Sequence, residues 1–288
     1  MKKIFGEFNM TWPKVIIFAI ITAVATALLN QVPALKDTSF TNMAISFEFW
    51  ILCALLIMMN SKSALDSALK TFVFFLISQP LIYLVEVPFL GWSIMGYYKN
   101  WILWTIATLP MAFIGYYMKK DKWWGLVILT PMLIFLGFHY SMFLGRTIFN
   151  FPHHLISAIF CVGTSFMYVT GIFENKKNKI AGVVIVLAIT AVFTFLTLRD
   201  IPVYNIQPVI SNSEENVVFD DTYTVYLKDE KMGDAKIRYI DSLEEYAVDV
   251  TFKKAGKTEL VLVSPDGEEM VFLINVPSQT YYEVERIK

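Results

Sequence analysis

The sequence predicts a bundle of seven membrane-spanning helices followed by a small all-β sandwich. The prediction rests on three observations: 56% of the 288 residues are hydrophobic, only 17% are charged, and the charges are unevenly spread. Soluble proteins have roughly 25% charged residues. Residues 1–200 hold 15 Lys/Arg and 8 Asp/Glu, for a formal charge of +7, whereas residues 201–288 hold 9 and 17, for −8. Such an asymmetry indicates two environments for the two parts of the chain.

The first apolar segment, residues 15–29, follows a short basic start and contains three alanines. This pattern is similar to that of a cleaved secretory signal peptide. The apolar run continues past the alanines, and Trp12-Pro13 suits the entry of a helix at a membrane interface. The pattern therefore favours an uncleaved first transmembrane helix. Cleavage would leave the orientation of the following chain unchanged.

Six further apolar segments have close to the ~20 residues that a helix needs to cross about 30 Å of hydrocarbon. They cover residues 43–60, 69–90, 100–118, 123–145, 152–173 and 180–198. Gln79-Pro80 and Pro88 interrupt the apolar run of the third segment, and a kink is expected there because proline inside a membrane helix frees a carbonyl group. Most of the tryptophans fall near segment ends, which is typical of interface anchors.

The charged residues between the segments predict the orientation. With a cytoplasmic N-terminus, one side carries eleven lysines: Lys2, Lys3, Lys14, Lys62, Lys70, Lys119, Lys120, Lys122, Lys176, Lys177 and Lys179. The other side carries only four basic residues near the membrane: Lys36, Lys99, Arg146 and Arg199. Cytoplasmic loops are enriched in Lys and Arg. Seven crossings then place the N-terminus in the cytoplasm and the C-terminal domain outside the cell.

Residues 201–208 are expected to be a linker, and residues 209–288 a β-domain. Apolar and polar residues alternate in short runs at 222–227, 235–240, 245–253, 258–263 and 270–276, and 281–287 could add one more strand. Turn sequences such as Ser264-Pro-Asp-Gly267 separate several of these runs. Five to seven short strands in about 80 residues fit a small antiparallel sandwich.

The stretch from Phe252 to Val276 resembles the last strands of a bacterial immunoglobulin-like domain. Its Lys254-Ala-Gly-Lys257 turn, the following strand, the Asp266-Gly267 hairpin and a closing strand match the end of such domains. The resemblance implies an immunoglobulin-like sandwich and a bacterial source. An excess of lysine, with 20 Lys against 4 Arg, also points to a bacterium with an AT-rich genome. The helical part resembles no family.

The composition also excludes several classes. An acidic C-terminal part argues against a nucleic-acid partner, which requires a basic patch. The two cysteines, Cys53 and Cys161, lie in apolar runs and indicate neither a disulfide framework nor a cysteine metal site. The chain lacks the HExxH, GxxxxGK[ST], CxxC and GxGxxG motifs. No cofactor is predicted from a motif.

Six ionisable residues are expected at similar depth, near the outer side of the membrane: Glu48, Glu86, His139, Arg146, His153 and His154. Counted along their segments at about 1.5 Å per residue, they fall within a slab roughly 10 Å thick. Ionisable side chains inside a membrane are costly and often mark a functional site. They are therefore the candidate ligand-binding residues.

Three interpretations of these six residues remain open. They could be interfacial side chains that pair or reach water. They could line an outward-facing pocket in which Arg146 binds an anionic group. Finally, zinc could bind to imidazole and carboxylate groups, with His139, His153, His154 and Glu86 as the candidates.

The function expected from the sequence is that of a bacterial plasma-membrane protein whose extracellular β-domain binds a ligand or protein partner. In this hypothesis the helices lie in the lipid bilayer as an anchor. Two alternatives use the polar residues instead: a transporter with an outward-facing site, and an intramembrane hydrolase or transferase.

Overall fold

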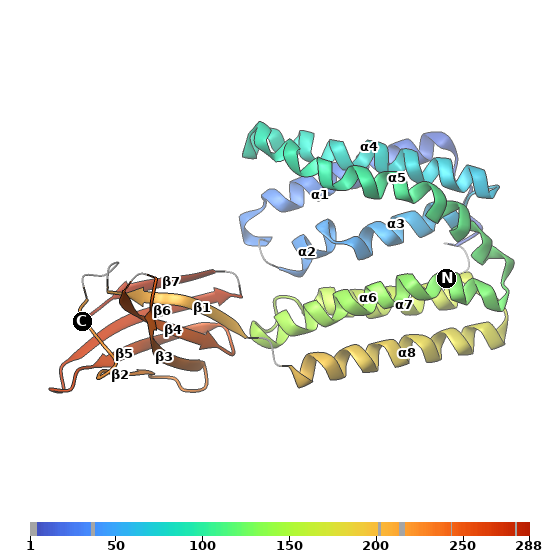
Figure 1. Cartoon of the computed structure of the whole chain (residues 1–288). Coiled ribbons are helices and arrows are strands. Elements are labelled where there is room, and N and C mark those ends of the chain that lie inside the picture. Colours follow the sequence, from blue (N-terminus) through green and yellow to red (C-terminus); the bar gives the residue numbers. More distant parts are fainter. Residues whose placement is uncertain (1–4, 36–37, 201–202, 213–216, 243, 280) are drawn as a thin grey trace. The chain divides into compact units, whose positions relative to one another are not determined.

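The computed structural model describes residues 5–35, 38–200, 203–212, 217–242, 244–279 and 281–288. The chain divides into two compact units (Figure 1). One contains Met1–Phe143 and His154–Leu196, and the other contains Leu144–His153 and Thr197–Lys288. Lys2, Lys3 and Lys36, which the orientation prediction used, lie outside the described residues.

The first unit is a bundle of apolar helices. Its elements are α1 (Trp12–Gln31), η1 (Pro33–Leu35), α2 (Ser39–Ile45), α3 (Phe47–Met59), α4 (Ala64–Leu90), η2 (Trp92–Tyr97), α5 (Tyr98–Gly115), η3 (Tyr116–Lys120), α6 (Trp123–Phe149), α7 (Leu155–Ile172) and α8 (Lys176–Arg199). Within the described ranges, six helical spans are long and apolar enough to cross a membrane, or seven if α2 and α3 form one span. The last residues of α6 and α8 belong to the second unit.

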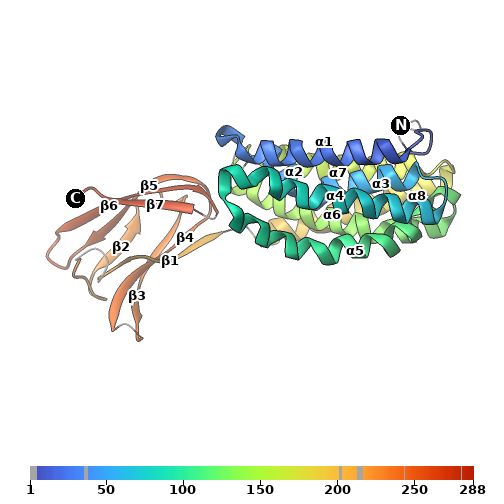
Figure 2. The same cartoon turned by 90° about the horizontal axis from the view of Figure 1, so that it is seen from above.

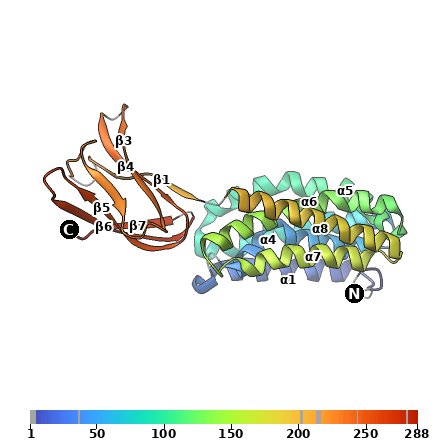
Figure 3. The ribbon, with the colours of Figure 1, turned by 90° about the horizontal axis from the view of Figure 1, so that it is seen from below.

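The helices form three layers. In Figure 1, α1, α4 and α5 lie on one side of α2 and α3, and α6, α7 and α8 lie on the other. The view from above shows α1 alongside α4 (Figure 2), and the view from below shows α6, α7 and α8 together (Figure 3). Ala19, Ala23 and Ala27 of α1 are completely buried. Small side chains at this spacing allow close packing of helices, so these alanines form a packing face.

The segment predicted at 43–60 is two helices, because the chain breaks at Ser46. The axes of α2 and α3 differ by 51°. Ser46 has an extended backbone, and its hydroxyl donates to Oε1 of Glu48 at 2.5 Å. The same hydroxyl also donates to the carbonyl oxygen of Met43 at 3.4 Å, and bonds from a serine side chain to the nearby backbone compete with a continuous helix. The sequence prediction treated this stretch as one short helix and missed the break.

Together α2 and α3 run from one end of the bundle to the other. At the start of α2, Ser39 hydrogen-bonds with Ser157 near the start of α7. After the end of α3, Asn60 accepts the backbone N–H groups of Gly6, Phe8 and Met10, just before α1. The pair therefore connects the end where α1 finishes to the end where α1 begins.

The loops at the end where α1 begins are bonded to one another. Tyr116 donates to the carbonyl oxygen of Lys62, and Lys119 donates to that of Ser61. The carboxylate of Asp121 accepts the backbone N–H groups of Glu174 and Asn175 at 2.9 and 2.6 Å. These loops contain several of the lysines that the sequence analysis assigned to one side, so we name this end the lysine-rich end.

Gln79-Pro80 and Pro88 interrupt the apolar run of this segment without breaking its helix. α4 is helical from Ala64 to Leu90 with both prolines inside it. Proline removes only one backbone hydrogen bond, and neighbouring helices can stabilise a helix that contains it. α4 lies between α1 and α5 (Figure 2).

The second unit is a β-sandwich with strands β1 (Tyr204–Ser211), β2 (Thr224–Leu227), β3 (Gly233–Ile240), β4 (Glu245–Phe252), β5 (Gly256–Val263), β6 (Glu269–Ser278) and β7 (Tyr281–Arg286). Its antiparallel sheets have the orders β1-β4-β3 and β2-β5-β6-β7. β1 occupies part of the expected linker 201–208. Its register with β4 shifts between Ile206 and Ile210, so Pro208 lies in an irregular part of an edge strand, where its missing N–H is tolerated.

The core of the sandwich includes a side chain from the end of α6. Phe149 is 2% exposed and packs among Ile206, Phe252 and Val276. Its carbonyl oxygen accepts the backbone N–H of Ala255 at 2.8 Å. The end of α6 is therefore part of the β-unit.

Candidate functional site

Glu48 and His139 meet inside the helical bundle. Oε2 of Glu48, on the first turn of α3, lies 3.0 Å from Nδ1 of His139 on α6. This distance is that of an ion pair if the imidazole is protonated, although the angles are not those of a regular hydrogen bond. Both residues are buried. The pair is one of the polar contacts that join the central layer of the bundle to its neighbour.

Aromatic rings surround the imidazole of His139. The ring centroid of Phe135, one turn earlier on α6, is 4.6 Å away, and that of Phe47 is 6.1 Å away. The ring centroids of Phe138 and Phe143 lie 6.0 and 6.2 Å from that of the imidazole. An apolar shell excludes water and strengthens the interaction between two polar groups. Glu48 is therefore the main polar partner that the structure gives to this histidine.

Glu86 has a different partner. Its Oε1 accepts the side-chain N–H of Asn30 at 2.9 Å, which links the last turns of α4 and α1. Polar contacts of this kind hold helices together within a membrane, typically by about 0.6 kcal/mol. Glu86 and Asn30 thus form a contact within the α1–α4 layer.

His154 also has its own partner. Its Nδ1 lies 2.7 Å from Nδ2 of Asn42, so His154 couples the turn before α7 to α2. His154 is buried, and Ser39 and Ser157 hydrogen-bond beside it. The contact between α2 and the start of α7 therefore includes several hydrogen bonds.

Arg146 and His153 belong to the unit of the β-sandwich. Arg146 is half-buried and His153 is exposed, and the backbone N–H of His153 bonds to Asn150. The side chain of Asn150 in turn donates to the carbonyl oxygen of Pro277. These two candidates lie where α6 joins the β-unit.

The six predicted residues thus enter separate contacts. Among the described residues, no three His, Cys, Asp or Glu side chains come close enough to hold a metal ion. The set of His139, His153, His154 and Glu86, proposed for zinc, is not assembled in that part of the chain. The sequence fixes the depth of a residue along its helix, whereas its direction around the helix depends on packing that depth does not reveal.

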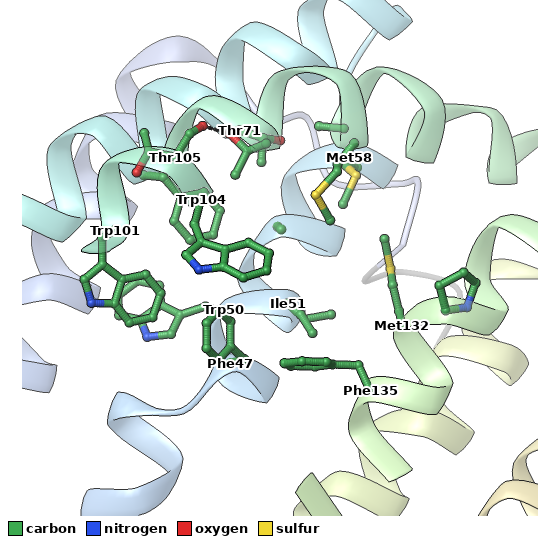
Figure 4. Close-up of a pocket in the computed structure, with 16 residues that line it drawn as sticks. Phe47, Trp50, Ile51, Met58, Thr71, Trp101, Trp104, Thr105, Met132 and Phe135 are labelled. Atoms are coloured by element: carbon green, nitrogen blue, oxygen red, sulfur yellow. Dashed lines mark hydrogen bonds between the residues drawn. The ribbon is translucent and has the colours of Figure 1, made fainter. Parts of the chain in front are cut away.

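An apolar cavity of about 230 Å³ lies beside the Glu48–His139 pair, between α3, α4, α5 and α6 (Figure 4). Phe47 and Phe135, whose rings contact His139, line one end of it. The full lining is Phe47, Trp50, Ile51, Ala54, Met58, Thr71, Phe75, Trp101, Trp104, Thr105, Thr108, Met111, Ala112, Pro131, Met132 and Phe135.

Figure 4 shows Trp101 and Trp104 on the α5 side of the cavity and Met132 and Phe135 on the α6 side. The position of the tryptophans near segment ends predicted interface anchors and gave no indication that they line a cavity. Trp50 is almost fully buried. The available signal was the presence of Trp101 and Trp104 three residues apart, on one face of a helix.

Two buried hydroxyl groups of the lining lack a hydrogen-bond partner among the described residues. They belong to Thr71 of α4, which is 1% exposed, and Thr105 of α5, which is 3% exposed. By contrast, the hydroxyl of Thr108 donates to the carbonyl oxygen of Thr105 at 2.6 Å. Most buried hydroxyls find a partner in the protein or in ordered water, and each exception requires an explanation.

The site thus combines a buried Glu–His contact with an aromatic cavity that has two hydroxyl groups without a partner in the described part of the chain. No protein-family model matches the chain, and no curated protein or solved structure is significantly similar to it.

Proposed function

We propose that the chain is a multi-pass protein of a bacterial plasma membrane, and that its β-domain recognises a ligand or protein partner outside the cell. The helices anchor this domain in the bilayer. The observation that carries the proposal is the division into two units of opposite character: a bundle of long apolar helices and a compact β-sandwich with its own core. The net charge of −8 on residues 201–288 suits a soluble compartment.

The arrangement of the bundle supports an extracellular β-domain. We count α2 and α3, which connect its two ends, as one bent crossing, and the described part of the chain then has seven candidate crossings. The loops of the lysine-rich end suit the cytoplasm. An odd number of crossings supports a β-domain on the side opposite to the N-terminus. The strand layout is also compatible with the immunoglobulin-like resemblance of residues 252–276.

A tyrosine pair on the β-unit supports a role in recognition. The rings of Tyr239 and Tyr246 lie 5.0 Å apart at the β3–β4 hairpin, and Tyr239 is 45% exposed. The other end of β4, at Phe252, packs against Phe149 of α6. The pair therefore lies at the end of the sandwich away from α6. Exposed aromatic side chains are enriched in interfaces, and the acidic charge of the domain favours a cationic partner.

The first stage of the test determines location. Val218→Cys places a thiol at a position that is 85% exposed on the β-unit, and Lys62→Cys places one at the lysine-rich end. The native cysteines, Cys53 and Cys161, are buried. In intact cells a membrane-impermeant maleimide should label Val218→Cys only, and Lys62→Cys should require permeabilised cells. Labelling of both variants, or of neither, in intact cells would contradict the proposed topology.

The second stage tests recognition. Cells that display the full chain are compared for binding of cationic peptides and cell-surface polymers, with Tyr239→Ala/Tyr246→Ala as the variant. We expect the double substitution to weaken binding, whereas His139→Ala and Glu86→Gln should leave it unchanged. Loss of binding in His139→Ala or Glu86→Gln variants that are folded would contradict the separation of recognition from the bundle.

The contact between Glu48 and His139 favours a second candidate, transport of a small polar ligand. Buried ionisable pairs in membrane proteins often serve ion or proton pathways. An intramembrane enzyme could use the same pair. For either activity, Glu48→Gln should abolish uptake or turnover in reconstituted vesicles while the β-domain keeps its binding. Full activity of this variant would exclude the pair from the function.

A further inference from the structure

We infer that the cavity between α3, α4, α5 and α6 binds a membrane-soluble lipid through a planar ring that bears a carbonyl oxygen, as in a quinone. The inference rests on the membrane placement proposed above and is independent of the role of the β-domain. The hydroxyls of Thr71 and Thr105 are the donors to the ring oxygens, and the aromatic side chains hold the ring.

The lining excludes a polar ligand. Its surface is formed by the apolar side chains of tryptophan, phenylalanine, methionine, isoleucine, alanine and proline residues, and by three threonines. An apolar cavity of about 150 Å³ in another protein stays dry and takes up benzene. A cavity of about 230 Å³ accommodates a ring system but not a whole lipid. Trp50, Trp101 and Trp104 provide flat faces, against which planar rings pack in offset or edge-on arrangements.

The unpaired hydroxyls specify the polar part of the ligand. Thr71 and Thr105 are buried, line the cavity and have no partner among the described residues. A buried hydroxyl without a partner is destabilising, and a carbonyl oxygen is the simplest group that accepts its proton. Each threonine lies seven residues into its helix, or about 10 Å from the helix start. An acyl chain offers no acceptor at such a depth, because its ester oxygens lie near the headgroups.

The cavity has a route to the bilayer. Trp104 and Met111 of α5 are 50% and 49% exposed, and Pro131 of α6 is also exposed. These lining residues therefore reach the surface of helices that are apolar enough to lie in lipid. Along α3 the lining extends from Phe47 to Met58, which corresponds to about 16 Å. A ligand ring can enter from the side while its hydrocarbon chain stays in the bilayer.

The experiment uses the full chain in lipid nanodiscs and two probes with the same short alkyl chain, a 1,4-naphthoquinone and a naphthalene. Binding is measured by saturable quenching of tryptophan fluorescence and by the ligand-induced rise in the melting temperature. We expect saturable binding of the quinone, and a 3- to 10-fold weaker affinity in each of Thr71→Val and Thr105→Val, as for the loss of one hydrogen bond. The affinity for naphthalene should stay the same in both variants.

Thr164→Val is the matched control, because its buried hydroxyl donates to the carbonyl oxygen of Phe160 and lies outside the cavity lining. It should leave quinone binding unchanged. Without ligand, Thr71→Val should melt no lower than wild type, since no hydrogen bond is lost, so weaker binding cannot be attributed to misfolding. Absence of saturable quinone binding, or equal effects of the variants on both probes, would overturn the inference. The labelling of Val218→Cys and Lys62→Cys tests the membrane topology separately. A failure of quinone binding can therefore be distinguished from a failure of the proposed topology.

Discussion

Replacing Phe149 with alanine should destabilise the β-domain, although Phe149 is the last residue of a bundle helix. Its side chain is 2% exposed within the core of the sandwich. A buried aromatic residue removes about 150–250 Å² from water, which corresponds to about 4–6 kcal/mol at ~25 cal/mol per Å². Measured Phe→Ala substitutions in cores cost about 3–5 kcal/mol. A domain is stable by only about 5–15 kcal/mol, so the effect should be large.

The assay is pulse proteolysis of the full chain in detergent with increasing urea, following the intact β-domain on a gel. Urea lowers the free energy of unfolding of small proteins by about 1–3 kcal/mol per M, so a loss of about 3 kcal/mol should lower the urea midpoint by about 1–3 M. Phe151→Ala is the matched control, since Phe151 is 71% exposed in the same unit. If Phe149→Ala shifts the urea midpoint no more than Phe151→Ala does, α6 does not contribute to the core of the sandwich.

Two further predictions concern polar groups. Glu48→Ala leaves His139 buried without its carboxylate and should lower the free energy of unfolding of the bundle by about 1–3 kcal/mol, measured by thermal unfolding. The double variant Glu48→Ala/His139→Leu should lose less stability than the sum of the two single variants. Additive losses would show that the two side chains do not interact. In the β-domain, hydrogen bonds from Asn275 and Tyr281 lower the pKa of Glu283. A carboxylate with a lowered pKa stabilises the folded state at a pH above its ordinary pKa of about 4.3, and this stabilisation is lost as the pH falls through the folded-state pKa. In urea unfolding below pH 4.3, wild type should therefore lose more stability than Glu283→Gln. Parallel pH profiles of the two proteins would contradict this assignment.

The sequence predicted the architecture where a strong pattern exists. Long apolar runs located the long helices, and period-two alternation located β2 to β7 within a few residues. It failed where local chemistry overrides the pattern. Ser46 ends a helix inside an apolar run, and Pro208 lies within an edge strand. In both places the local backbone conformation departs from the one that the surrounding run of residue types predicts.

The candidate site could be predicted only in part. Residue depth brought Glu48 and His139 to a similar height, and the structure places them in contact. The same reasoning grouped Glu86 with them, yet Glu86 faces Asn30. An uncharged amide such as that of Asn30, at the end of an apolar run, is not a strong signal of a partner for a carboxylate. The cavity has no signature in the sequence, since its lining consists of residues that are common in any membrane helix.

The break in the helix at Ser46 affects both parts of the candidate site, the cavity and the Glu48–His139 contact. After it, α3 presents Phe47, Ile51, Ala54 and Met58 to the cavity, at the three- and four-residue spacing of one helix face. Glu48 lies one position further around the helix and meets His139 on α6. A helix that is apolar on all sides is usually buried, and its sequence does not show which face meets which neighbour. The orientation of α3 after the break at Ser46 therefore determines which of its side chains line the cavity and which residue Glu48 contacts.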